Sequence, residues 1–63
     1  MAVIEVNGNQ VPITGGRTVL DTMIVAGYAP DAFLYMVEGR PVPSDSVFVG
    51  DETVRAIKVA SGG

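Results

Sequence analysis

The segment Ala2–Ile13, AVIEVNGNQVPI, predicts a β-hairpin, and the rest of the fold is built outward from it. Its first half places Ala2, Ile4 and Val6 on one apolar face with Glu5 opposite, the alternation of a half-buried strand. Asn7-Gly8-Asn9 follows at once, and Asn-Gly between apolar runs favours a tight hairpin turn because both residues tolerate positive φ.

The return strand of this hairpin is expected at residues 10–13. Pro12 has no N–H to donate to a strand ladder. We therefore expect this strand at an edge of the sheet, or with its N–H side unpaired.

A short helix is expected after the turn at residues 14–16. Thr18 is placed to cap it, and Asp21 can complete a weaker form of the capping box. Gly27 is typical of the residue that ends a helix, so a helix of about nine residues is expected, with Val25 on its polar side. Its buried face is predicted from apolar spacings of three and four residues: Val19, Leu20, Met23, Ile24 and Gly27.

The second half of the chain alternates strands with turns. A loop at residues 28–31 precedes a strand at Phe33–Val37, and the turn Glu38-Gly39 leads into a short edge segment that contains Pro41. Residues 43–46 form a further turn. The last strand, Thr53–Val59, carries apolar residues on both faces: Val54 and Ala56 on one, Ile57 and Val59 on the other.

This order predicts an α+β fold, a mixed sheet of four to five strands with one helix on one face. The first and last strands would be central and parallel, as in the β-grasp arrangement, and the other face of the sheet would be free. We expect one domain at residues 1–59, followed by a flexible tail at residues 60–63.

Composition narrows the function. The chain has no cysteine and no histidine, so it lacks the most reactive nucleophile, the commonest general base and the commonest metal ligand, and an enzyme is not expected. The net charge of −3, with four scattered basic residues, disfavours nucleic-acid binding and favours a basic protein partner. Without a membrane-spanning run or a signal peptide, we expect a cytoplasmic monomer that binds no metal or cofactor and no membrane.

The sequence given ends in Ser61-Gly62-Gly63. Because glycine has no Cβ, such a tail can enter a channel too narrow for side chains, and the Gly63 carboxylate is sterically open. Two final glycines can also be incidental, or the remnant of a linker.

Nearly the whole chain resembles the ubiquitin-like β-grasp proteins that end in Gly-Gly. The likeness is greatest to the small archaeal modifier proteins and to the sulfur carriers of the ThiS, MoaD and Urm type. Three features carry it: the element order, the block YMVEGRPVP at residues 35–43, and Gly50-Asp51-Glu52 before a strand that runs into Gly62-Gly63. The chain is shorter than MoaD proteins generally are.

The resemblance implies a chemistry at Gly63, with Ser61 and Gly62 threading into the partner. A ubiquitin-activating-type (MoeB/ThiF-like) enzyme would use ATP and Mg²⁺ to adenylate the Gly63 carboxylate. A sulfurtransferase step would then give a thiocarboxylate for tRNA thiolation or cofactor biosynthesis, or a target lysine would form an isopeptide bond, as in sampylation. The chain would be substrate and carrier, not catalyst.

The resemblance also implies a docking patch for the activating enzyme on the free face of the sheet, made of Met36, Ile57 and Val59 with Arg55 and Lys58 beside it. Lys58 is the only lysine, so self-conjugation would use Lys58 or the N-terminal amine.

Two other classes of function stay open. The chain could be a noncovalent β-grasp binding module with an incidental glycine tail. It could also be a metal-dependent enzyme that uses Asp45, Asp51 and Glu52, although carboxylates in turns are usually solvated and the spacing defines no ligand set.

Overall fold

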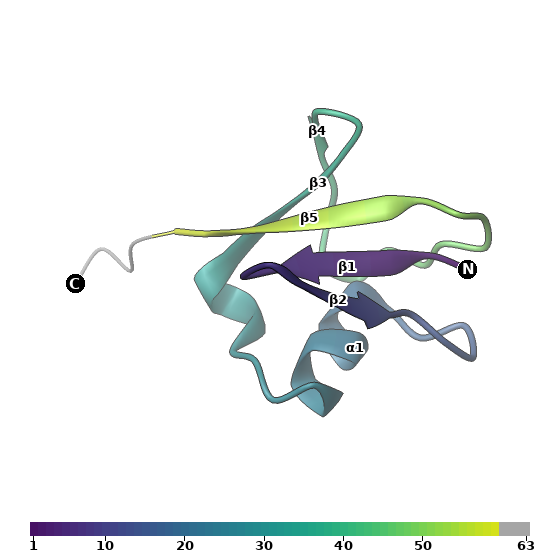
Figure 1. Cartoon of the computed structure of the whole chain (residues 1–63), viewed down its shortest axis with the longest axis horizontal. Coiled ribbons are helices and arrows are strands. Elements are labelled where there is room, and N and C mark those ends of the chain that lie inside the picture. The colour runs from purple at the N-terminus through teal and green to yellow at the C-terminus, as the bar shows by residue number, and fades with distance from the viewer. Residues whose placement is uncertain (60–63) are drawn as a thin grey trace.

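The computed structural model describes residues 1–59 and shows an α+β fold, with one α-helix and a five-stranded mixed sheet (Figure 1). The predicted fold class is therefore confirmed at the level of one helix and a mixed sheet. The predictions for Ser61, Gly62 and Gly63 lie outside the described residues.

The predicted hairpin is formed by β1 (Val3–Val6) and β2 (Asn9–Pro12), which pair in antiparallel register. Asn7 and Gly8 between them have φ of 50° and 80°, the left-handed values that a tight two-residue turn needs. The strands begin and end within a residue of the prediction, and β2 lies at a sheet edge as Pro12 required.

The sheet order is β2-β1-β5-β3-β4. β5 (Thr53–Lys58) lies in the middle and runs parallel to β1, so the prediction of central, parallel first and last strands is confirmed. β3 (Phe33–Val37) pairs antiparallel with β5, and the short β4 (Arg40–Pro41) closes the other edge.

The helix α1 (Val19–Val25) has seven residues and begins where Thr18 caps it. The Thr18 hydroxyl accepts a hydrogen bond of 3.0 Å from the backbone N–H of Asp21. The two preceding amides, at Val19 and Leu20, donate to the carbonyls of Ser46 and Ser44. The turn at residues 43–46 therefore satisfies the backbone groups that the first turn of a helix leaves free.

The helix ends in a Schellman motif at Gly27. The Tyr28 amide donates to the Met23 carbonyl at 3.0 Å, and the Gly27 amide donates to Ile24 at 3.0 Å, with Gly27 at φ of 90°. Gly27 thus ends the helix as predicted, but Ala26 is already the cap, so the helix is shorter than expected.

A 3₁₀ turn, η1 (Pro30–Ala32), replaces part of the predicted loop before β3. The hydroxyl of the buried Tyr35 donates to the Pro30 carbonyl at 2.8 Å. Burial raises the pKa of Tyr35, and the negative charge of Asp31 raises it further. The tyrosine therefore reaches from the sheet to η1 and satisfies its polar group there.

The core lies between one sheet face and α1. The predicted buried face of the helix was wrong at two residues, because Ile24 is 55% exposed and Gly27 is exposed as well. Thr22, which the apolar spacing did not include, is buried. Thr22 can be buried because its hydroxyl donates to the Thr18 carbonyl at 2.8 Å. Val25 is exposed, as expected. The buried apolar residues are Ala2, Ile4, Val6, Ile13, Val19, Met23, Tyr35 and Val54.

Candidate functional site: the open face of the sheet

The face of the sheet opposite α1 carries a group of apolar side chains near the end of β5. Strand register puts Leu34 of β3 beside Ile57 of β5, and the two are 45% and 44% exposed. Met36 follows Leu34 on the same face, and Val59 follows Ile57 at 42% exposure. We call these four residues the open-face patch: Leu34, Met36, Ile57 and Val59.

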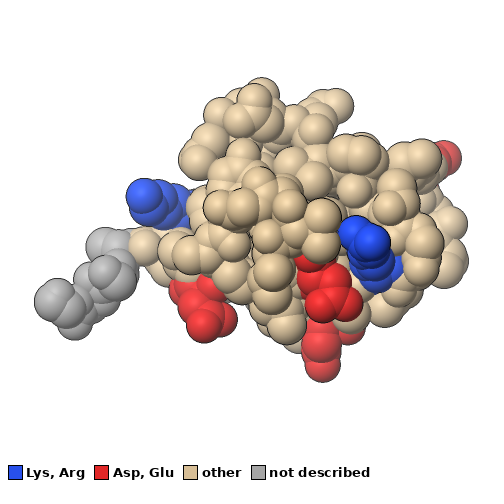
Figure 2. Space-filling model, turned by 90° about the horizontal axis from the view of Figure 1, so that it is seen from below, with Lys and Arg blue, Asp and Glu red and all other residues tan. Residues whose placement is uncertain are grey.

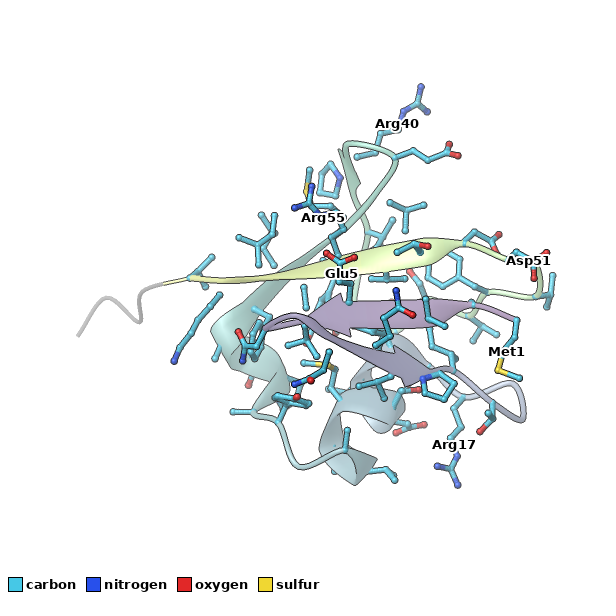
Figure 3. The ribbon with its side chains drawn as sticks, in the orientation of Figure 1. Met1, Glu5, Arg17, Arg40, Asp51 and Arg55 are labelled. Atoms are coloured by element: carbon cyan, nitrogen blue, oxygen red, sulfur yellow. The ribbon has the colours of Figure 1, made fainter. Side chains whose placement is uncertain are left out.

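Charged side chains adjoin this patch along one row of the sheet. Arg55 of β5 is the register partner of both Met36 and Glu5, so the three residues share the open face across three strands. Arg55 and Glu5 lie close together over β5 in Figure 3. The patch therefore borders one positive and one negative group.

Lys58 does not flank the open-face patch, contrary to the prediction. It pairs with Phe33, whose side chain packs against the core, so alternation places Lys58 on the helix-covered side of the sheet, where it is exposed. Arg55 is thus the predicted basic residue that shares a face with Ile57.

The end of β5 is held to the sheet up to Val59. The Val59 amide donates to the Ala32 carbonyl at 2.9 Å, which extends the β3–β5 ladder by one pair. In Figure 1 this end of β5 reaches past the β1–β2 hairpin. Val59, a member of the open-face patch, is therefore the last residue before the tail segment Ala60-Ser61-Gly62-Gly63.

Leu34 is the member of the patch that the sequence reasoning missed. Period-two alternation within Phe33–Val37 puts it on the same face as Met36, and that signal would have identified it. The pairing of Leu34 with Ile57 depends on the register between β3 and β5.

Residues 1–59 hold no group of three or more Asp, Glu, His or Cys side chains arranged to bind a metal ion. Asp51, one of the carboxylates considered for this role, instead accepts a hydrogen bond from the N-terminal ammonium of Met1, which lowers its pKa; the ammonium's charge lowers it further.

Basic side chains are dispersed over the described surface. The side of the molecule drawn in Figure 2 shows acidic groups lying between two separate basic groups, with uncharged surface around them. This side offers no continuous positive stripe of the kind that tracks a phosphate backbone. The longest helix between residues 1 and 59 has seven residues, too few to cross a bilayer.

No model of a known protein family matches this sequence, and no match emerges among curated proteins. The case for a function therefore depends on the residues and their arrangement.

Proposed function

We propose that this chain is a ubiquitin-like β-grasp protein that acts as a covalent carrier or modifier through the carboxylate of Gly63. The observation that carries the proposal is the juxtaposition of three features: a parallel β1–β5 pair at the centre of the sheet, one helix on one face, and an apolar patch beside the end of β5. The sequence that follows this strand is Ala60-Ser61-Gly62-Gly63.

In the proposed reaction the partner is an activating enzyme of the MoeB/ThiF type, which uses ATP and Mg²⁺. A Gly63 carboxylate oxygen attacks the α-phosphate of ATP, pyrophosphate leaves, and an acyl-adenylate forms. Hydrosulfide or a target lysine amine then attacks the activated carbonyl, AMP leaves, and the attacking group loses a proton. The products are a thiocarboxylate, which donates sulfur, or an isopeptide conjugate.

In this proposal the folded domain supplies recognition and no catalytic group. The open-face patch gives the activating enzyme an apolar contact next to the strand that leads into the tail. Arg55 and Glu5 at its border supply charges that orient the partner. Because the chain is the substrate, its rate of activation depends on how well this face fits the enzyme.

The first experiment is mass spectrometry of the protein in its native host. Replacement of oxygen by sulfur at Gly63 establishes a sulfur carrier. In a tryptic digest, cleavage after Lys58 leaves the remnant Val59-Ala60-Ser61-Gly62-Gly63 on any modified lysine, which establishes a protein modifier. The chain without Gly62 and Gly63 is the control, and it should give neither product.

The alternative function is a noncovalent binding module, which the open-face patch would also suit. Deletion of Gly62 and Gly63 separates the two, because a carrier loses its activity and a binding module keeps its partner. A free carboxylate alone, even under raised sulfur demand, would contradict the carrier proposal.

The docking role of the open-face patch has its own test. Leu34→Ser should slow formation of the acyl-adenylate by about tenfold, the effect of losing a central apolar contact. Val25→Ser is the matched control, since Val25 is 69% exposed on α1, on the other side of the sheet. Equal rates for the two variants would contradict docking through this patch.

A further inference from the structure

Three of the four prolines in the chain lie at the two edges of the sheet. Pro12 ends β2 at one edge, and Pro41 and Pro43 lie in and after β4 at the other. All three are exposed. The edges are where a folded sheet presents unpaired backbone groups that another chain can pair with.

The hydrogen bonds between β1 and β2 show in which direction a backbone N–H at residue 12 would point. The Ile13 amide donates to the Ala2 carbonyl at 2.8 Å, so Ala2 and Ile13 form a hydrogen-bonded pair. Such pairs alternate with non-bonded ones along an antiparallel ladder, and Val3 with Pro12 is the next pair. The Val3 amide confirms this, since it points away from β2 and donates to the Glu52 carbonyl of the neighbouring chain segment at 3.1 Å.

Pro12 therefore occupies a position whose N–H would point outward from the sheet. Pro12 therefore costs the β1–β2 ladder no hydrogen bond, because Val11 and Ile13 are the residues of this strand that bond to β1 here. A strand arriving at this edge would find the outward N–H of Gln10 and no donor at Pro12.

The β4 edge repeats the arrangement. The Val42 amide donates inward to the Tyr35 carbonyl at 2.9 Å. The residue before it, Pro41, is paired with Met36 and falls at an outward position, and Pro43 follows Val42 without an N–H. This edge offers no donor from residue 41 or residue 43.

We propose that these three prolines close both sheet edges to strand addition and so keep the domain monomeric. Pairing of edges needs alternating outward donors and acceptors, and proline removes the donor at residues 12, 41 and 43, which leaves Gln10 as the outward donor of β2. Partners are then directed to the faces of the sheet. This proposal concerns the edges and does not depend on the chemistry at Gly63.

The first test is Pro12→Thr, with Gln10→Thr as the matched control. Both substitutions put threonine at an exposed, outward-facing position of β2, but Pro12→Thr alone adds a backbone donor. With this donor restored, two β2 edges can pair across a two-fold axis. Light scattering after size exclusion should show the mass of Pro12→Thr rising about twofold with concentration, while Gln10→Thr stays monomeric.

The second test is the double variant P41T/P43T at the other edge, with Arg40→Thr as the control. β4 has two residues against four in β2, so association should be weaker than for Pro12→Thr. Amide exchange of β1 and β5 shows that each variant is folded. Monomeric, folded Pro12→Thr and P41T/P43T at every concentration, or equal association of Gln10→Thr, would overturn the proposal.

Discussion

The two faces of the sheet differ most clearly on its two central strands. On the helix-covered face, Ile4 of β1 and Val54 of β5 are fully buried side by side. On the open face, Ile57 of β5 is 44% exposed, one strand away from Ile4. Two isoleucines in adjacent strands thus meet different surroundings, because α1 covers one face only.

This difference shows how the chain divides its apolar residues. Nearly half of the residues are hydrophobic, but a domain of this length has room to bury only part of them. Those on the covered face make the core, and the open-face patch stays near the end of β5. An apolar residue on the open face therefore contributes little to folding and is available for contact.

The largest effect should come from Ile4→Ala, which opens a cavity under α1. Loss of a fully buried isoleucine costs about 2–5 kcal/mol of unfolding free energy. A domain of this size has roughly 3–9 kcal/mol in total, so this substitution should remove a large share of its stability. Ile4→Val gives a graded version at about 0.5–1.5 kcal/mol.

Urea unfolding followed by circular dichroism measures both Ile4 variants. A loss for Ile4→Ala no larger than for Ile4→Val would mean that the covered face repacks freely. The contrast between the two faces would then not hold in solution.

The next largest loss of stability is expected from Thr18→Ala. This substitution removes the N-terminal cap of α1, the helix that covers one face of the sheet. The Asp21 amide loses its hydrogen-bond acceptor, at a cost of about 1 kcal/mol. Thr18→Ser is the control, because serine keeps the hydroxyl. Thermal unfolding should rank the wild type and Thr18→Ser together above Thr18→Ala. An unchanged Thr18→Ala would show that the carbonyls of Ser44 and Ser46 hold the helix start without the cap.

Local chemistry made much of this fold predictable. Asn7-Gly8 adopts the positive φ that its residue types favour, and Thr18 and Gly27 end the helix through bonds within a few residues. Such signals need no knowledge of the rest of the chain. Because Pro12 lacks an N–H, its strand was also predicted to lie at an edge.

Features that depend on distant contacts were predicted less well. A helix of seven residues makes about two turns, so its apolar spacing fits more than one face, and Ile24 was placed in the core instead of Thr22. The bond from the Thr22 hydroxyl to the Thr18 carbonyl is local, but which face of the helix meets the sheet depends on how α1 packs. The face of the sheet on which Lys58 lies also follows from its pairing with Phe33, which the sequence alone did not give.

The candidate site was predicted in part for the same reason. Alternation along β5 placed Ile57 and Val59 together on the open face, but their neighbours on β3 follow from the strand register. Alternation along β3 could have placed Leu34 on the open face, but its pairing with Ile57 follows only from that register. The chemistry at Gly63 stays a prediction from the sequence, since it lies outside residues 1–59.

A smaller effect is expected from Ile57→Ala, the counterpart of Ile4→Ala on the open face. The side chain is already 44% exposed, so its truncation should lower the unfolding free energy by about 1 kcal/mol or less. The same urea titration measures it. A loss as large as that of Ile4→Ala would mean that the open face is covered in solution, by self-association or by another part of the chain.

The smallest effect concerns neither face but the end of the sheet where Asp51 meets the N-terminus (Figure 3). The hydrogen bond from the Met1 ammonium lowers the pKa of Asp51, so this contact stabilises the fold above the ordinary Asp pKa of about 3.9. The contribution is lost as the pH falls through the lower pKa of the folded state. Asp51→Asn should therefore be slightly less stable than the wild type at neutral pH and equal to it in strong acid.

Thermal unfolding from neutral to acidic pH, at low and high salt, measures this difference between Asp51→Asn and the wild type. Both groups are exposed, so salt should reduce it. Asp45→Asn serves as the control, because Asp45 is an exposed carboxylate without a hydrogen bond or ion pair among residues 1–59. A difference that persists in strong acid would assign the effect of Asp51 to its loop geometry instead of its charge. A difference that disappears in strong acid would assign the effect to the charge of Asp51, as its contact with the Met1 ammonium predicts.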